Sequence, residues 1–368
     1  MKKIRFMANN FLESTFTYSS QKTGFPASNA TNTSRSKVWR PAGNFEITSS
    51  NNSIYINDGS NKTVTLTSGS YTYSSLATHV QTQLNASSSS WTCTYSTTTN
   101  KFTIARSSGT RIMRFSQTTS AAWDTLGYTQ TADTTGSPSS FIADEARIHT
   151  SEWLKCDMGV AQEATFAALI GPIDSVFTLS SAATVKVQAS NLDSWAAPPV
   201  DVTVPVGSAA MKMLDDDIGT AYRYWRIVII DRLNPLGPEG LEIGYAYLGD
   251  HKTVTLSNIA TGFSKSLVDA SVPLQSESGA LFFESRPRYL SISGAEIQLL
   301  NGTEYDELEQ LFYDLGISTP FIVSIDPGTE VSRNLTDLTR LVVMSSPPQI
   351  QHIIRDYYTI QFEMREAF

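Results

Sequence analysis

Cysteine is nearly absent from this sequence. The two among its 368 residues, Cys93 and Cys156, lie far apart and form no CxxC pair. Two thiols cannot build a disulfide framework, so we expect synthesis in a reducing compartment. Each cysteine is predicted to be a small, buried apolar side chain.

Charge and long apolar runs are also scarce. Charged residues make up 17% of the chain, the net charge is −8, and no stretch is rich in Lys and Arg. Phosphate contact requires clustered basic side chains, so nucleic acid is not an expected partner. No stretch approaches the roughly 20 apolar residues of a membrane helix, and MKKIRFMANNFLE lacks the apolar region of a signal peptide. We therefore expect a protein that is made in a cytoplasm and does not insert into membranes.

A catalytic constellation is missing as well. The four histidines, His79, His149, His251 and His352, are scattered, and no HExxH, GxSxG or phosphate-binding glycine loop is present. Cys156 lies in a predicted core strand without a histidine nearby in the sequence, so a nucleophilic role is not expected. The sequence predicts no enzyme, and no catalytic or cofactor-binding residue.

Two acidic clusters remain as candidate sites. The run Asp215, Asp216 and Asp217 offers the oxygen ligands that a hard cation prefers, although a solvated loop before the next strand is the favoured explanation. Asp144 and Glu145 are adjacent, and on a strand they would point to opposite faces and could not share a substrate. No metal site is predicted, and cation binding at the aspartate run stays open.

Serine, threonine and alternating strands dominate what is present. SIYIND and KTVTLTSG alternate apolar and polar residues around the turn signal NDGSN, and WTCTY and KFTIA flank the turn TTTN. Between these hairpins, Ser74 or Ser75 can cap a helix whose apolar face is Leu76, Val80 and Leu84. This stretch predicts one small α+β unit, followed by the linker TQTADTTGSPSS.

Longer strands follow this unit. EWLKCDMG, TFAALIGP, TVKVQAS, VDVTVPV, YRYWRIVII and GLEIGYAYLGD are separated by turn residues at the spacing of a β-sandwich. No βαβ alternation appears, which argues against a parallel α/β sheet.

The last part of the chain predicts strands around one helix. LFFES and RYLSISGAEIQLL precede the helix, and FIVSIDP, RLVVMS and YYTIQFEM follow it. Thr303 and Asp306 form a near capping box, and Gly316 ends the helix. Its predicted apolar face consists of Tyr305, Leu308, Leu311, Phe312 and Leu315.

One set of strand motifs resembles a known family. W-x-x-x-D-x-G at EWLKCDMG, V-x-V-x-x-S at TVKVQAS, YWRIVI and the final IGYAYLG are similar to discoidin-type, galactose-binding-like β-sandwiches, which are jelly rolls of about eight strands. In that family a tryptophan segment closely precedes the first motif. Here the matching segment, SKVWRPAGNFEI with Trp39, lies more than a hundred residues before Trp153. The small α+β unit therefore reads as an insertion into a surface loop of the sandwich.

The other two parts resemble pieces of tailed-phage virion proteins. The inserted unit is similar to a small module of such proteins, and the end of the chain resembles distal-tail and baseplate proteins. The resulting fold class is mainly β: a discoidin-like jelly-roll sandwich with an inserted small α+β domain and a C-terminal β-rich (α+β) domain. The expected boundaries are 1–46 for the N-terminal arm and first part of the sandwich, 47–139 for the insertion, 140–255 for the rest of the sandwich and 256–368 for the C-terminal domain.

Aromatic and basic residues alternate on one predicted strand. Tyr222 and Tyr224 are expected on one face, and Arg223 and Trp225 on the other, with Arg226 next along the chain. Discoidin-like modules bind sugars through end loops, but these mid-strand residues favour core packing. The turn-rich loop at 233–240 is the better candidate for ligand or partner contact.

Three functions remain open. The first is a structural virion protein of a phage tail tip, a distal-tail or baseplate component that assembles into a homo-oligomeric ring with other tail proteins. In it, segment 353–368 is a candidate subunit contact whose deletion should abolish the ring. The alternative is a carbohydrate-binding receptor-recognition module, an adhesin without a ring-forming role; host-surface glycan is a candidate partner in both. A glycan-cleaving enzyme ranks last, because it needs two facing carboxylates about 5 to 10 Å apart.

Overall fold

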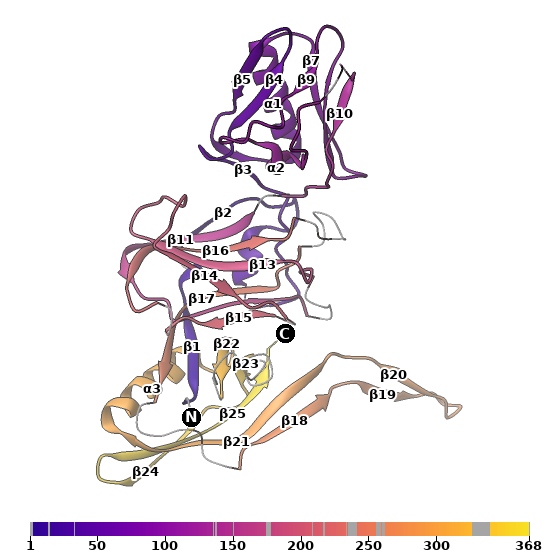
Figure 1. Ribbon diagram of the computed structural model, residues 1–368. Helices are drawn as coiled ribbons and strands as arrows, with labels where there is room; N and C mark the ends of the chain where they lie inside the picture. Colours follow the sequence, from indigo (N-terminus) through magenta and orange to yellow (C-terminus); the bar gives the residue numbers. More distant parts are fainter. Residues whose placement is uncertain are drawn as a thin grey trace.

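Most of the chain forms antiparallel β-sheets. The computed structural model describes residues 3–13, 15–32, 34–134, 136, 138–149, 151–173, 178–207, 209–215, 218–232, 234, 241–254, 259, 262–325 and 339–367. Strands account for 46% and helices for 12%, which confirms the mainly-β fold class. Three units follow one another along the molecule: an inserted unit, a sandwich and a C-terminal unit (Figure 1). Within the described residues, none of the helices combines the length and hydropathy needed to cross a bilayer.

The sandwich is the central unit. Its elements are β1 (Arg5–Asn10), η1 (Phe11–Glu13), β2 (Phe16–Tyr18), η2 (Ala27–Thr31), β11 (Glu152–Gln162), β12 (Phe166–Ile170), β13 (Thr184–Ser190), β14 (Val200–Val204), β15 (Ala210–Met213), β16 (Tyr222–Ile230) and β17 (Tyr245–Thr253). One sheet has the order β14-β13-β16-β11-β2, and β15-β12-β17-β1 face it. Leu154, Val187 and Trp225 of the first sheet share one core with Leu169 and Leu248 of the second. Apolar residues at every second position of these strands build that core.

Trp39 belongs to the sandwich core despite its distance from the later strands. The side chain is fully buried in the same cluster as Leu154. Its backbone N–H donates to the carbonyl of Ile243 at 2.9 Å, and its Nε1 donates to the carbonyl of Ser20 at 3.0 Å. The segment around Trp39 therefore packs as part of the sandwich.

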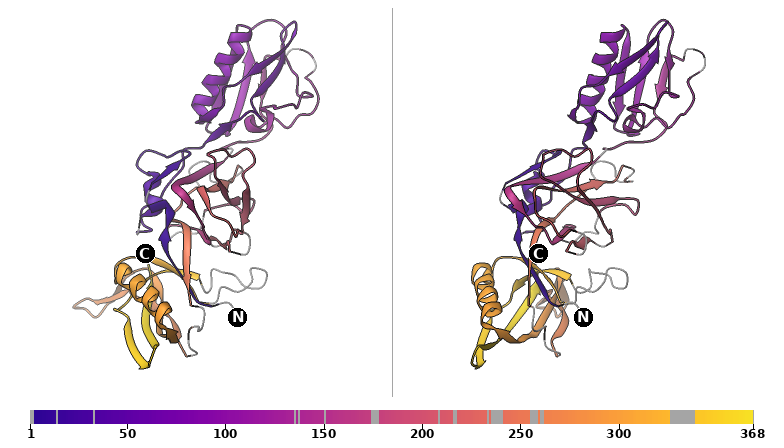
Figure 2. Two further views of the ribbon diagram at one scale, coloured as in Figure 1. Left: turned by 90° about the vertical axis from the view of Figure 1, so that its left-hand side faces the viewer. Right: turned by 60° about the vertical axis from the view of Figure 1, so that its left-hand side comes forward.

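The inserted unit has its own core. Its elements are β3 (Phe45–Ile47), β4 (Ser53–Asn57), β5 (Asn61–Thr65), β6 (Gly69–Tyr71), α1 (Tyr73–Ser87), β7 (Trp91–Ser96), β8 (Lys101–Arg106), β9 (Ile112–Met113), α2 (Trp123–Leu126) and β10 (Ser140–Ile142). One buried cluster runs from Phe45 to Ala143 and contains Trp91 and Phe102. Figure 2 shows α1 covering one face of the strands.

Helix α1 forms where its apolar period predicts it. Leu76, Val80 and Leu84 are buried at four-residue spacing, which confirms the predicted face. The cap lies earlier than expected: Thr72 is the N-cap, and its side chain and that of Ser75 form a reciprocal capping box. The prediction of Ser74 or Ser75 as the cap was wrong, because the extended backbone of residue 72 already presents its hydroxyl to the Ser75 N–H.

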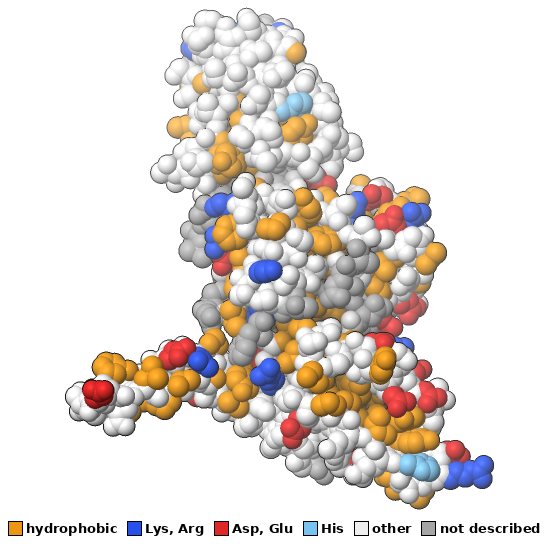
Figure 3. All heavy atoms as spheres, turned by 180° about the vertical axis from the view of Figure 1, so that it is seen from behind, with side chains coloured by type: hydrophobic (Ala, Val, Ile, Leu, Met, Phe, Trp, Pro, Cys, Tyr) orange, Lys and Arg blue, Asp and Glu red, His pale blue; other side chains and the backbone are white. Residues whose placement is uncertain are grey.

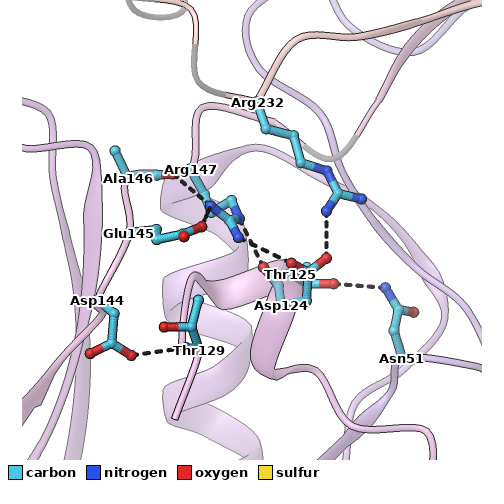
Figure 4. A network of polar contacts seen from close by, with 9 residues as sticks. All are labelled: Asn51, Asp124, Thr125, Thr129, Asp144, Glu145, Ala146, Arg147 and Arg232. Atoms are coloured by element: carbon cyan, nitrogen blue, oxygen red, sulfur yellow. Dashed lines mark hydrogen bonds and ion pairs between the residues drawn. The ribbon is translucent and has the colours of Figure 1, made fainter. Parts of the chain in front are cut away.

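A polar network joins the inserted unit to the sandwich (Figure 4). Arg232, which follows β16, forms an ion pair with Asp124 of α2. Arg147 donates to the carbonyl and a carboxylate oxygen of the same aspartate, both at 3.0 Å, and to Glu145 at 2.6 Å. Burial alone raises the pKa of Asp124, but the two guanidinium groups hold it below its usual value. The Asp124 carboxylate is thus paired with Arg147 of the inserted unit and with Arg232 of the sandwich.

The C-terminal unit completes a sheet that begins in the sandwich. Its elements are β18 (Ser264–Asp269), β19 (Val272–Gln275), β20 (Leu281–Glu284), β21 (Arg288–Asn301), α3 (Gly302–Leu315), β22 (Phe321–Ser324), β23 (Thr339–Met344), β24 (Gln349–Ile354) and β25 (Tyr357–Glu366). Strand β1 pairs with β17 on one side and β22 on the other, so Arg5 faces both Thr253 and Ser324. The ring centre of Phe6 lies 5.5 Å from that of Phe312 and 5.9 Å from that of Phe362. The N-terminal strand therefore contributes to the C-terminal core.

The apolar face of α3 and its end at Gly316 confirm the prediction, but its N-cap does not. Leu308, Phe312 and Leu315 are buried, and Gly316 is the C-cap. The N-cap is Asn301, whose side chain accepts a hydrogen bond from the backbone N–H of Glu304 at 2.9 Å. Because an asparagine caps at least as well as a threonine, the helix starts two residues earlier than the Thr303 pattern predicted.

A two-stranded arm projects from this unit (Figure 1). Strands β18 and β21 pair along its base, and β19 and β20 pair toward its tip. A turn closes the arm, with the backbone N–H of Ser276 donating to the carbonyl of Ala280 at 2.9 Å.

Candidate functional site

The four histidines lie in different parts of the fold. Their partners are the Thr67 N–H for His79, the Asp231 N–H for His149, the Thr165 hydroxyl for His251 and the Tyr358 ring for His352. Burial lowers the pKa of His149 to about 4 and also lowers that of His79 and His251. Each ring serves a local contact with backbone or a neighbouring side chain.

Both cysteines are buried core residues, as predicted. Cys156 lies on β11, and its Sγ is 3.6 Å from the carbonyl of Trp225. Burial raises the pKa of Cys93 and of Cys156 to about 12. A thiol that stays protonated at neutral pH is a poor nucleophile.

The acidic pair Asp144 and Glu145 does not lie on a strand. It follows β10 in a bend, where Asp144 accepts from the Thr129 N–H at 2.8 Å and Glu145 pairs with Arg147 at 2.6 Å. Figure 4 shows the two carboxylates directed at these separate partners. Both are thus engaged in holding local structure.

Asp215 forms an ion pair with an arginine of the same chain. Its carboxylate accepts two hydrogen bonds from Arg5, at 2.8 and 2.6 Å. Although burial alone raises it, the pKa of Asp215 lies below its usual value because of Arg5. Asp216 and Asp217 lie outside the described residues. In the part of the chain that the structure describes, no group of three or more His, Cys, Asp or Glu side chains is placed to hold a metal ion.

The strand with interleaved aromatics departs from simple alternation. Trp225 is fully buried in the sandwich core, and Tyr222 packs edge-on against it at 6.0 Å. Arg223 lies outside and stacks over Tyr224 at 4.9 Å. The predicted pairing of faces was wrong, because Tyr222 packs against the same core cluster as Trp225, while Tyr224 and Arg223 lie on the outside. Core packing holds for Trp225, while Tyr224 stays on the outer face.

An open depression of about 430 Å³ lies on this outer face. Its walls include Lys155 and Asp157 of β11, Phe16 of β2, Asp193 and Tyr224. We call it the Tyr224 depression. It combines aromatic rings with charged side chains that can donate and accept hydrogen bonds.

Two fixed ion pairs border the Tyr224 depression. Lys155 Nζ donates to both carboxylate oxygens of Asp193, at 2.9 and 2.7 Å. Arg223 makes a bidentate pair with Asp157 at 2.8 and 2.9 Å, and these hydrogen bonds lower the pKa of Asp157 to about 2. The pairs place donors and acceptors beside the Tyr224 ring.

A buried arginine supports this surface. Arg226 lies beneath Trp195, with its guanidinium carbon 4.3 Å from the ring centre, and donates to Gln188 at 2.7 Å. Burial lowers the pKa of Arg226 to about 10. Trp195 in turn donates to Asp193 at 2.8 Å, which links the buried guanidinium to the rim of the depression.

Sequence reasoning found only part of this surface. Tyr224 and Arg223 came from the aromatic strand, and Asp157 stands in the W-x-x-x-D-x-G motif. Lys155 and Asp193 were missed, since only the fold brings the loop after β13 beside β11. The predicted contact loop at 233–240 lies outside the described residues, apart from Asn234.

The arm carries a second candidate surface, made of apolar side chains. Its most exposed members are Leu267 (65%), Leu274 (52%), Leu281 (63%), Phe282 (59%) and Phe283 (68%). Figure 3 shows hydrophobic side chains running along the projecting arm. Large exposed apolar patches mark interaction surfaces, because water contact with them is unfavourable. The sequence predicted a strand at LFFES, yet an apolar run alone cannot reveal that its strand leaves the core.

Most of segment 353–368 belongs to the C-terminal core. Its strand β25 is paired with β21, β23 and β24, and Ile360, Phe362 and Met364 are buried in the C-terminal core. Deleting the segment would therefore unfold that unit, so loss of a ring on deletion would not identify a contact. Exposed apolar side chains of the segment lie at its start, with Ile353 and Ile354.

Comparison with known proteins gives little support for any assignment. No protein-family model matches the sequence, and no curated protein matches it. The lectin domain of lectinolysin complexed with Lewis B antigen is 12% identical over 28% of this chain and 69% of that chain, with a TM-score of 0.20. A fucolectin from striped bass (Morone saxatilis) serum is 10% identical over 60% of this chain and 83% of that chain, with a TM-score of 0.19. TM-scores this low do not establish a shared architecture.

Proposed function

We propose that this protein is a structural component of a phage tail tip, in the distal tail or baseplate, and that it acts by assembling with copies of itself. The observation that carries the proposal is the exposed apolar surface of the arm, above all Leu281 and Phe283. The resemblance of the inserted and C-terminal parts to tail proteins supports the viral setting.

The exposed apolar side chains of the arm favour contact with another protein surface. An isolated two-stranded ribbon is marginal in water, and this one adds large apolar side chains that face solvent. Burying one Leu or Phe contributes about 1.5–3 kcal/mol. A contact that covers several of them therefore offsets a large part of the entropic cost of association.

Light scattering and negative-stain electron microscopy test the proposal. The wild-type protein should form a closed oligomer, and the double substitution Leu281→Ser with Phe283→Ser should release monomers. Loss of two buried side chains corresponds to roughly a 100-fold weaker contact or more, at about 1.4 kcal/mol per factor of ten. The matched control is Tyr313→Ser on α3, an 83% exposed aromatic away from the arm, which should leave the oligomer intact. A wild-type protein that stays monomeric at high concentration contradicts the proposal.

Carbohydrate binding is a second candidate function, favoured by the Tyr224 depression. Sugar rings stack on aromatic faces, and their hydroxyls suit fixed carboxylate and ammonium pairs such as Asp193 with Lys155. An array of galactose-, fucose- and N-acetylhexosamine-terminated glycans provides the test. Binding that is lost in Tyr224→Ala and in Asp193→Ala, but kept in Tyr313→Ala, supports it. An absence of binding to the whole array, or binding that survives Tyr224→Ala, contradicts it.

A further inference from the structure

The C-terminal unit has a second apolar strip besides the arm. Strand β24 carries Ile350 (38% exposed), Ile353 (51%) and Ile354 (57%), and Tyr357 (38%) begins the next strand. Among the described strands, β24 pairs with β25 and with no other, so its outer edge is open. An open edge with apolar side chains is a template for pairing with another strand.

The arm offers two edges, and they are not equivalent. Toward the tip, β19 pairs with β20 and no third described strand joins them. Strand β19 contains Pro273, which has no N–H to donate, whereas β20 has no proline. The edge of β20 is therefore the one suited to continue a sheet.

Apolar side chains cover both faces of the arm. Leu274 is paired with Phe282, and Pro273 with Phe283, and neighbouring pairs point to opposite faces. A partner that lies on one face would leave the other face exposed. Edge-to-edge pairing brings both faces of β20 beside side chains of the partner strand.

The charges on β20 and β24 do not oppose pairing between these two strands. Glu284 on β20 and His352 on β24 are the only titratable residues of the two strands, both of which the structure describes in full. Glu284 is already paired with Arg286 at 3.1 Å. Pairing these edges brings no like charges together and buries no isolated ion.

We propose that β20 of one copy pairs with the open edge of β24 of a second copy. The arm and the β24–β25 hairpin project on opposite sides of the unit, so each copy gives an arm and receives one (Figure 1). Such a head-to-tail contact uses two different surfaces and closes into a ring when the rotation permits. This inference rests on the proposed function and names the surfaces that join its subunits.

Engineered cysteines test this contact directly. One tagged copy carries Phe282→Cys and a differently tagged copy carries Ile353→Cys; the two are co-expressed and treated with a short bismaleimide. The native cysteines are buried, so the wild-type protein should not react. Crosslinked dimers that contain both tags should form in the mixture, at a level well above that of either variant alone. The matched control pairs Phe282→Cys with Tyr313→Cys, at an exposed position on α3, and should give only background crosslinking.

Light scattering on the same samples separates the outcomes. Assembly together with a crosslink between the Phe282→Cys copy and the Ile353→Cys copy supports the inference. Assembly without that crosslink, or crosslinking of Phe282→Cys to itself through arm-to-arm contact, overturns the inference and leaves the proposed assembly standing. A protein that remains monomeric and uncrosslinked at high concentration overturns both.

Discussion

The backbone N–H of Asn44 donates a hydrogen bond of 2.6 Å to Oε1 of Glu152, across 108 positions of the sequence. The Asn44 side chain adds a second bond, from Nδ2 to the carbonyl of Ser151 at 2.9 Å. Asn44 is the last residue before the inserted unit, and Glu152 begins the strand that follows it. One fully buried carboxylate therefore joins the two ends of the insertion.

Replacing Glu152 by Gln should change how stability depends on pH. Burial raises the pKa of Glu152 from 4.5 to about 7, although the hydroxyls of Ser19 and Ser20 and the backbone near Asn44 oppose the shift. A raised folded-state pKa means stability that is complete below pH 4.5 and is lost as the pH rises through 7. The difference in unfolding free energy between wild type and variant should fall by about 1.4 kcal/mol per pH unit in that window. Urea titrations at several pH values measure it.

The contribution of His149 to the unfolding free energy should depend on pH in the opposite direction. Burial lowers its pKa from 6.5 to about 4, so its contribution is complete above pH 6.5 and is lost as the pH falls through 4. The difference between wild type and His149→Gln should therefore rise with pH over this range. Equal slopes for the two variants would contradict the assignment of both groups.

Gly43→Ala should destabilise the protein more than Gly24→Ala. Both glycines have left-handed backbone, with φ of +89° and +85°. A Cβ at residue 43 would lie 2.6 Å from the carbonyl oxygen of Ile148, whereas one at residue 24 meets nothing within 4 Å. The left-handed conformation costs an alanine about 1–2 kcal/mol at either site, and the clash should add about 2 kcal/mol or more at residue 43. Thermal and urea unfolding of the two variants measure the difference in stability. Equal losses of stability would show that the backbone around Gly43 and Ile148 can relax.

The two arginines on Asp124 should differ in their effect on stability. Arg147 is only 5% exposed and bonds to Asp124 and Glu145, so Arg147→Ala should cost about 2–3 kcal/mol. The Arg232 side chain is 34% exposed, and its pair is screened by solvent, so Arg232→Ala should cost less than about 1 kcal/mol. Chemical denaturation at low and high salt compares them. A larger loss for Arg232 would mean that the contact between units, and not the inserted unit alone, limits stability.

Thr72→Ala should destabilise the inserted unit by about 1 kcal/mol, the usual cost of losing an N-cap. Ser74→Ala is the matched control, because Ser74 lies in the same turn but does not cap the helix. The fall in melting temperature of the two variants gives the comparison. A greater effect at Ser74 would restore the cap position suggested by the sequence.

Local signals explain what the sequence could predict. The helix face at Leu76, Val80 and Leu84 and the stop at Gly316 depend on neighbours within a few residues. The insertion was visible because Trp39 and Trp153 carry parts of one pattern on either side of it. Such features need no knowledge of distant contacts.

Contacts across long distances explain what it could not predict. Asp215 looked like a free acidic loop until the fold placed Arg5 against it. Tyr222 packs against the sandwich core with Trp225, a tertiary contact that the alternation of its own strand does not reveal. The exposure of Phe282 and Phe283 follows from the arm leaving the sheet, and an apolar run in the sequence is the same for a buried strand.

The position of β1 between β17 and β22 also determines when this strand can pair during synthesis. The core of the inserted unit comes from one continuous stretch between Phe45 and Ala143, so it can close while the ribosome is still making the rest. Strand β1 is made before all of this, yet its two neighbours, β17 and β22, emerge much later. Strand β1 therefore waits for partners made much later, and Phe6 and Met7 lack their final packing until β17 and β22 have been synthesised.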